Sequence, residues 1–184
     1  MYDLAEFIKD MELITSQTQD HNLIIKKSKP ALKKLLQNKN FLPIVSKEFK
    51  NNERYSRYLI YSDPNNKFFI FSMLWPPNQD APIHDHNGTW GIEGVHQGRL
   101  RVKNFIKLPD KEKIKLKTLS QFILNSNELA DLTKSLNIHK VENLDKKSIS
   151  IHVYGEKLMK MNIYSRINDN DEYSMEEKTL SIDN

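Results

Sequence analysis

The sequence predicts a mainly β protein, a sandwich or small barrel, with helices before it. From about Arg54 onward, short runs rich in β-branched and aromatic residues alternate with turn sequences such as residues 63–66 and 97–98. Many short strands with regular turns are typical of sandwiches and small barrels. Before Arg54, apolar residues recur at helical spacing, so we expect helices that cover one side of the β structure.

Composition limits the class of protein. The 184 residues are enough for one domain with a hydrophobic core, and no apolar run reaches the ~18–20 residues of a membrane span. The first residues lack a signal-peptide layout, so we expect a cytoplasmic protein. Because there is no cysteine, disulfides and cysteine-ligated metal sites are excluded. Any metal must be bound by nitrogen and oxygen atoms.

The helices are expected within the first forty residues. Residues 23–27 are ambiguous, and a further helix is expected to begin with Ser28 as its cap and Pro30 in its first turn, and to end near Pro43. The apolar stripe of the first helix is Leu4, Phe7, Ile8, Met11 and Ile14.

The strands are expected to form a barrel over residues 54–166. A helical layer over 1–45 precedes it, and an acidic tail over 167–184 follows, for which no structure is predicted. The expected strands are Tyr55–Tyr61, Lys67–Trp75, Gly91–Gln97, Leu100–Leu108, Asn137–Leu144, Ser148–Gly155 and Met159–Arg166.

A basic run lies between Lys26 and Lys50, which holds eight lysines and one acid, Glu48. Such a run is either a nucleic-acid patch or a solvated helix face. It has no arginine and little aromatic interleaving, which favours the solvated face. We therefore expect neither a nucleic-acid nor a membrane partner.

The strand Ser148–Gly155 separates its side chains by chemistry. Ile149, Ile151 and Val153 share one face, and the polar Ser150, His152 and Tyr154 share the other. The polar face lies either in water or inside a barrel whose outer face is covered by helices. A lumen lined by groups that relay hydrogen bonds is the interpretation we favour, because His139 lies one strand earlier.

Three histidines point to a metal site. His84 and His86 flank Asp85, and alternate residues of a strand point the same way, so both imidazoles can reach one ion. His139, on a distant strand, would complete one face of the coordination sphere and leave the other open. Taken singly, His84 or His86 is better explained as a turn residue; the joint spacing favours a metal site.

The segment from Trp75 through His84 and His86 to Gly98 resembles the first cupin motif, and His139 with Asn143 resembles the end of the second. Most cupins place a glutamate four or five residues after the second histidine, a position held here by Gly91. A three-histidine cupin followed by serine, histidine and tyrosine at alternate positions is similar to the cysteine dioxygenase family. The resemblance spans roughly residues 55–154 and implies a jelly-roll-like cupin barrel with helices packed outside.

Carried over by position, the resemblance assigns roles to the site residues. It implies that iron(II) is bound by His84, His86 and His139. It implies a hydrogen-bonded set of Ser150, His152 and Tyr154, whose tyrosine hydroxyl faces the substrate. It implies that Arg57 grips the substrate carboxylate, that Tyr55 lies beside it, and that Trp75 lines the pocket.

The chain departs from the family pattern in two places. Mammalian members join a cysteine to the active-site tyrosine; Gly91 holds the cysteine position here, so that cross-link is impossible and Tyr154 must be placed by Ser150 and His152. The second motif carries Lys134 and Leu136 where proline and glycine are usual.

The function implied is oxidation of L-cysteine by O2 to cysteine sulfinate, in a monomeric enzyme. Imidazole suits iron, and three facial ligands leave three positions for a thiol, an amine and O2. A guanidinium holds a carboxylate through two parallel hydrogen bonds, which favours an acidic thiol. Alternatives are a dioxygenase of 3-mercaptopropionate, whose similar members generally carry glutamine at the position of Arg57, a non-catalytic metal-binding cupin, and a metal-dependent isomerase.

Overall fold

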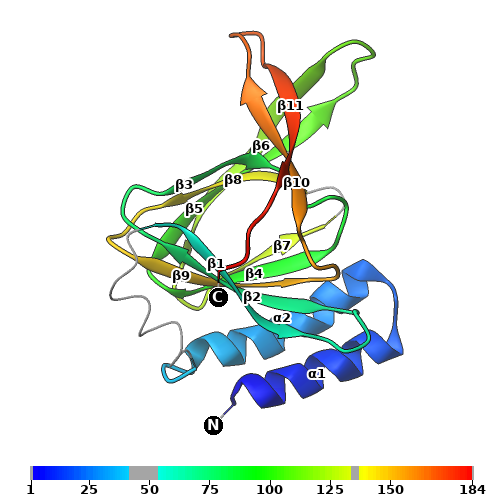
Figure 1. The fold of residues 1–184 in the computed structure, drawn as a ribbon, viewed down its shortest axis with the longest axis vertical. Helices are drawn as coiled ribbons and strands as arrows, with labels where there is room; N and C mark the ends of the chain where they lie inside the picture. Colours follow the sequence, from blue (N-terminus) through cyan, green and yellow to red (C-terminus); the bar gives the residue numbers. More distant parts are fainter. Residues whose placement is uncertain (1, 42–53, 134–136, 184) are drawn as a thin grey trace.

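The computed structural model describes residues 2–41, 54–133 and 137–183. Two helices precede two β-sheets, one five-stranded in the order β1-β2-β9-β4-β7 and one closed as a barrel in the order β10-β11-β6-β5-β8-β3 (Figure 1). The elements are α1 (Leu4–Gln17), α2 (His21–Gln37), β1 (Ser56–Ser62), β2 (Phe69–Trp75), β3 (Asp80–His84), β4 (Gly91–Gln97), β5 (Arg99–Leu108), β6 (Ile114–Asn125), β7 (Leu129–Leu132), β8 (Ile138–Asn143), β9 (Ser148–Tyr154), β10 (Lys160–Arg166) and β11 (Glu172–Thr179). The predicted mainly β fold is confirmed.

The two helices cover the outer face of the five-stranded sheet (Figure 1). Phe7 of α1 and Leu35 of α2 are fully buried in one cluster with Ile92 of β4 and Ile151 of β9. Ile149, Ile151 and Val153 therefore face the helices, and the polar side chains of β9 turn to the other side of the sheet. The polar face of this strand thus lies in the interior rather than in water, and His152 and Tyr154 line a cavity together with residues of the other sheet.

The predicted helix start at Ser28 is wrong, because α2 runs unbroken from its cap at Asp20. The Asp20 carboxylate accepts the backbone N–H of Asn22 at 2.9 Å. Ser28 lies mid-helix, where its hydroxyl donates to the Ile24 carbonyl at 2.7 Å, and Pro30 lies inside the same helix. A proline inside a helix costs about 3 kcal/mol. Burial of the apolar face of α2 offsets that cost.

Each predicted strand is present with ends shifted by no more than two residues, and β4 has the predicted bounds. Four strands, β3, β6, β7 and β11, were not predicted. No structure was predicted for the tail, but it forms β11, which pairs with the whole of β10, from Lys160↔Thr179 to Arg166↔Tyr173. This ribbon is polar and mostly exposed, so it carries no apolar alternation by which a strand is recognised.

The lysines of α2, such as Lys26 and Lys33, lie on its exposed face, in keeping with a solvated surface. Lys47, Lys50, Lys134 and Leu136 lie outside the described residues. No helix within the described ranges is long and apolar enough to cross a membrane.

Candidate metal centre

Three histidine rings converge between β3 and β8. His84 ends β3 and pairs directly with His139 of β8, while His86 follows two residues after the strand has ended. The expectation that His84 and His86 alternate on one strand is therefore wrong, although their rings still meet. One nitrogen from each of the three lies within 4.8 Å of the others, and the Nε2 atoms of His84 and His139 are 3.2 Å apart. Nitrogens bound to one ion at about 2.1 Å on adjacent corners would be about 3 Å apart, so the arrangement fits a metal.

The outer nitrogens of two rings are fixed by backbone carbonyls. His84 Nδ1 lies 2.8 Å from the Pro82 carbonyl, and His86 Nδ1 lies 3.1 Å from the Asn137 carbonyl. A carbonyl only accepts, so both rings carry their proton on Nδ1. Their Nε2 lone pairs are left for a ligand bond.

Burial keeps these rings neutral. Desolvation lowers the pKa of His84 and lowers that of His139 well below its ordinary value. Desolvation, with a smaller contribution from the neighbouring His84, lowers the pKa of His86 to about 3. A metal does not have to displace protons from such rings at neutral pH. Three imidazoles without a thiolate suit several transition metals, iron among them.

Asp85 anchors the turn between the two histidines. Its carboxylate accepts the side-chain amide of Asn162 at 2.9 Å and the hydroxyl of Tyr164 at 2.9 Å, both from β10. Burial acts to raise the pKa of Asp85, but the hydrogen bonds from Asn162 and its neighbours lower it on balance. Asp85 thus faces away from the metal site as a charged anchor.

A chain of hydrogen bonds runs from β2 along the inner face of β9. The indole Nε1 of Trp75 donates to Ser150 Oγ at 2.8 Å, and Ser150 Oγ lies 2.7 Å from His152 Nε2. His152 Nδ1 lies 2.9 Å from the Tyr154 hydroxyl. All four side chains are nearly inaccessible to solvent, so the chain is shielded from competing water.

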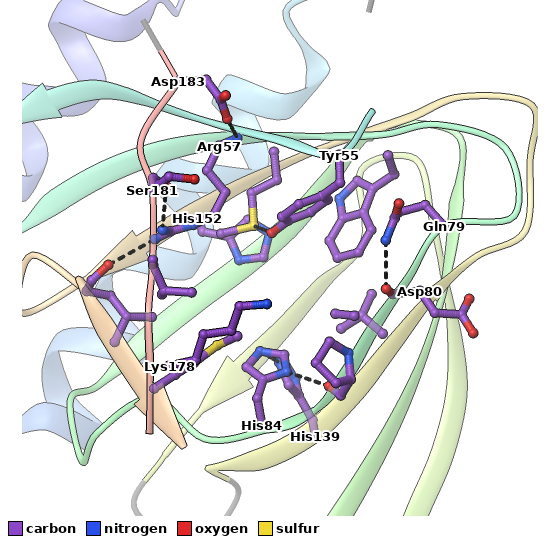
Figure 2. A pocket seen from close by; sticks show the side chains of 18 of the residues that line it. Tyr55, Arg57, Gln79, Asp80, His84, His139, His152, Lys178, Ser181 and Asp183 are labelled. Carbon is purple, nitrogen blue, oxygen red and sulfur yellow. Dashed lines mark hydrogen bonds between the residues drawn. The ribbon is translucent and has the colours of Figure 1, made fainter. Parts of the chain in front are cut away.

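A cavity of about 260 Å³ opens beside the histidines (Figure 2). Its volume suits a small molecule rather than a large cofactor. The predicted residues that line it are Tyr55, Arg57, Trp75, His84, His139, His152 and Tyr154.

Arg57 reaches this cavity from β1 and is only 5% exposed. Its guanidinium donates to the carbonyls of Leu158 at 3.0 Å and Ser181 at 3.1 Å, and it lies over the Phe71 ring. Within the described ranges, no carboxylate forms an ion pair with this guanidinium. Tyr55 packs edge-on against Trp75, and burial raises the pKa of Tyr55 to about 12.

The tail supplies cavity residues that were not predicted. Lys178 of β11 points into the cavity, and Ser181 and Asp183 lie along the segment that follows (Figure 2). The Asp183 carboxylate accepts the backbone N–H of Arg57 at 2.9 Å and pairs with Arg54 at 2.6 Å. No apolar pattern marks this segment, so nothing in its sequence signals a role at the cavity.

Glu93 is a second residue that was not predicted. It lies on β4, is 3% exposed, and places Oε1 3.7 Å from His139 Nδ1 and Oε2 3.3 Å from His152 Nδ1. Burial raises the pKa of Glu93 to about 8. Its spacing could have indicated a place at the site, because Glu93 lies two residues after Gly91 and therefore on the same face of β4.

Comparison with known proteins identifies the family. A model of the family described as cysteine dioxygenase type I matches residues 46–167, more than half of the chain. The chain belongs to this family. Membership confirms the resemblance carried by the two histidine motifs, and with it the cupin character of the barrel.

Individual relatives match over part of their length. Human cysteine dioxygenase type 1 is 29% identical over 103 residues, which cover 55% of this chain and 50% of that protein. The Danio rerio protein of the same name is 30% identical over 104 residues, covering 55% of this chain and 51% of its own. The chain thus spans about half the length of these cysteine dioxygenase relatives.

Solved structures give more distant likenesses. A protein from Thermus thermophilus has a TM-score of 0.44 and 14% identity over 58% of this chain and 87% of its own. The cupin domain of Schizosaccharomyces pombe Cnp3 has a TM-score of 0.42 and 12% identity over 58% of this chain and 64% of that chain. These likenesses add no weight to the family assignment.

Proposed function

We propose that this protein is an iron(II)-dependent thiol dioxygenase that converts L-cysteine and O2 into cysteine sulfinate. The observation that carries the proposal is the convergence of three buried, neutral imidazoles beside a small cavity that also presents a guanidinium and a phenol. Membership of the cysteine dioxygenase type I family supports it. Both atoms of O2 would join the sulfur, so the thiol RSH becomes RSO2H and no further reductant is consumed.

His84, His86 and His139 would hold the iron. A ferrous ion there would supply a shared binding point for thiolate and O2, and would favour the thiolate over the thiol. Desolvation keeps the His84 and His86 rings neutral, and backbone carbonyls at their Nδ1 atoms fix the orientation of both rings. No protein carboxylate occupies the position of the usual cupin glutamate, because Gly91 stands there.

Arg57 would bind the carboxylate of cysteine. Two of the five N–H groups of a guanidinium are used here by the Leu158 and Ser181 carbonyls, and the others remain for a ligand. Both partners are neutral, so the full positive charge is available to an anion in a buried site, where ion pairing is strong.

The hydrogen-bond chain of β9 would direct the Tyr154 hydroxyl into the cavity. An indole only donates, so Ser150 Oγ accepts from Trp75 and its own hydrogen can go to His152 Nε2. His152 then carries its proton on Nδ1, facing the Tyr154 oxygen. The Tyr154 hydrogen is left to donate to substrate oxygen, and burial raises the pKa of Tyr154 well above its ordinary value, so it stays a phenol.

The test is oxygen uptake by anaerobically prepared, ferrous-loaded protein given cysteine and isotopically labelled O2. We expect one sulfinate for each O2 consumed, with both oxygens from O2, and no uptake by metal-free protein. Loaded protein that consumes no O2 with cysteine would refute the proposal and favour a non-catalytic cupin. A larger kcat/KM for 3-mercaptopropionate than for cysteine would keep the dioxygenase and change its substrate.

A further inference from the structure

The Nδ1 atoms of the three proposed iron ligands differ in their hydrogen-bond partners. His84 and His86 each present Nδ1 to a backbone carbonyl at hydrogen-bond distance. His139 is 2% exposed, and its Nδ1 has no hydrogen-bond partner among the described residues. A buried ring nitrogen without a partner is uncommon and calls for a physical explanation.

The atom that faces this nitrogen is a carboxylate oxygen. Glu93 Oε1 lies 3.7 Å from His139 Nδ1, about 0.8 Å longer than an ordinary N–H···O bond, and it too has no hydrogen-bond partner among the described residues. The two unpartnered atoms thus face each other inside the protein. A small movement of either side chain would join them.

The second oxygen of Glu93 faces the hydrogen-bond chain. Glu93 Oε2 lies 3.3 Å from His152 Nδ1, because Glu93 and His152 are directly paired between β4 and β9. One carboxylate therefore lies between a proposed iron ligand and the ring that positions Tyr154. An isolated carboxylate at 3% exposure is strongly disfavoured, and a nearby cation compensates that cost.

We propose that Glu93 is a positioning residue of the metal centre: it accepts the Nδ1–H of His139, turns His139 Nε2 toward the ion, and carries a buried negative charge while the cation is bound. The usual cupin glutamate binds the metal itself; here the carboxylate acts one shell further out, through the ligand ring. Outer carboxylates that hold a ligand histidine raise its basicity and fix its orientation. The inference rests on the proposed function only in that a metal binds the three histidines.

The test replaces Glu93 by glutamine, which keeps the shape and removes the charge. Affinity for ferrous iron is measured anaerobically against a competing chelator, and the ligand field is read from the cobalt(II) spectrum. We expect E93Q to bind iron about 10–100-fold more weakly, with a changed cobalt spectrum. The metal-free variant should melt near the wild-type temperature, because burial raises the pKa of Glu93 to about 8 and the metal-free protein therefore carries little charge there at neutral pH. E93D, which keeps the charge on a shorter chain, should bind iron with intermediate affinity.

Glu112→Gln is the matched control, because Glu112 lies exposed in the loop between β5 and β6. It should leave iron affinity unchanged. Wild-type affinity and spectrum in E93Q would overturn the inference, and so would failure of metal-free E93Q to fold, which would make Glu93 a residue of the fold. Neither thiol nor O2 is used, so wild-type protein that binds iron without oxidising cysteine refutes the proposed function and leaves this test intact.

Discussion

Replacing Arg57 by glutamine tests how the cavity selects its substrate. Glutamine ends near the position of Arg57 Nε, so it also loses the two bonds that the terminal nitrogens of Arg57 donate to the Leu158 and Ser181 carbonyls. It carries no charge and cannot hold a carboxylate through two parallel bonds. The change therefore removes the proposed clamp together with two bonds to the cavity lining, and a substrate without a carboxylate is needed to separate the two effects.

The size of the effect follows from burial. A hydrogen bond to a charged partner contributes about 1.5–3 kcal/mol, and Arg57 is only 5% exposed, so solvent screens this interaction weakly. At about 1.4 kcal/mol for each factor of ten, kcat/KM for cysteine should fall by about 10–100-fold. Cysteamine, which has the thiol and amine but no carboxylate, should lose little.

The assay is initial oxygen uptake by wild-type and R57Q protein at equal iron content, with cysteine and cysteamine in parallel. A fall confined to cysteine supports the clamp. Equal losses with both thiols would show that Arg57 acts on the fold or on the metal, and an unchanged kcat/KM for cysteine would remove it from substrate binding altogether.

Three further predictions concern the tyrosine and the histidines. Tyr154→Phe should lower kcat by about 100-fold with iron affinity unchanged, since the hydroxyl bonded to His152 is lost while the three histidine ligands are untouched; loss of iron would contradict this. Gly91→Ala should also lower kcat, because a Cβ at Gly91 would lie 2.8 Å from the Tyr154 ring and such overpacking costs about 1–3 kcal/mol; wild-type kcat would show that the ring need not stay in place. Burial lowers the pKa of His86 from 6.5 to about 3, so unfolded chains bind a proton that folded metal-free protein does not. The resulting stability is full above pH 6.5 and is lost toward pH 3, about 2 kcal/mol between pH 7 and pH 5 by urea denaturation. His86→Gln should remove that contribution, and an unaltered pH dependence would contradict the assignment.

The inward and outward faces of β9 could be predicted from sequence because apolar and polar residues alternate clearly along this strand. On β9, Ile151 is in the outer core and His152 is at the cavity, as the pattern indicated. The same reasoning misplaced His86, since β3 ends at His84 and the following turn, anchored by Asp85, brings the ring back. A turn held by long-range hydrogen bonds leaves no periodic signal.

The residues that escaped prediction share a physical cause. Asp183 and Lys178 belong to a polar segment whose place is set by backbone pairing with β10 and by bonds to Arg57, not by burial of apolar side chains. Glu93 was not predicted because charged residues are ordinarily expected at the surface, and this glutamate is buried. The position of each of these residues is explained only when the strand that pairs with its own segment is known.

The absence of cysteine does not leave Tyr154 loose. Gly91 pairs directly with Tyr154 between β4 and β9, and the ring occupies the space that a side chain at Gly91 would fill. His152 holds the hydroxyl, and Phe71 lies 6.0 Å from the ring on the other strand. Tyr154 is 2% exposed and hydrogen-bonded, so its side chain is restrained without a covalent link. Close packing of the Tyr154 ring against Gly91 is therefore part of how this chain places the proposed site tyrosine without a thioether.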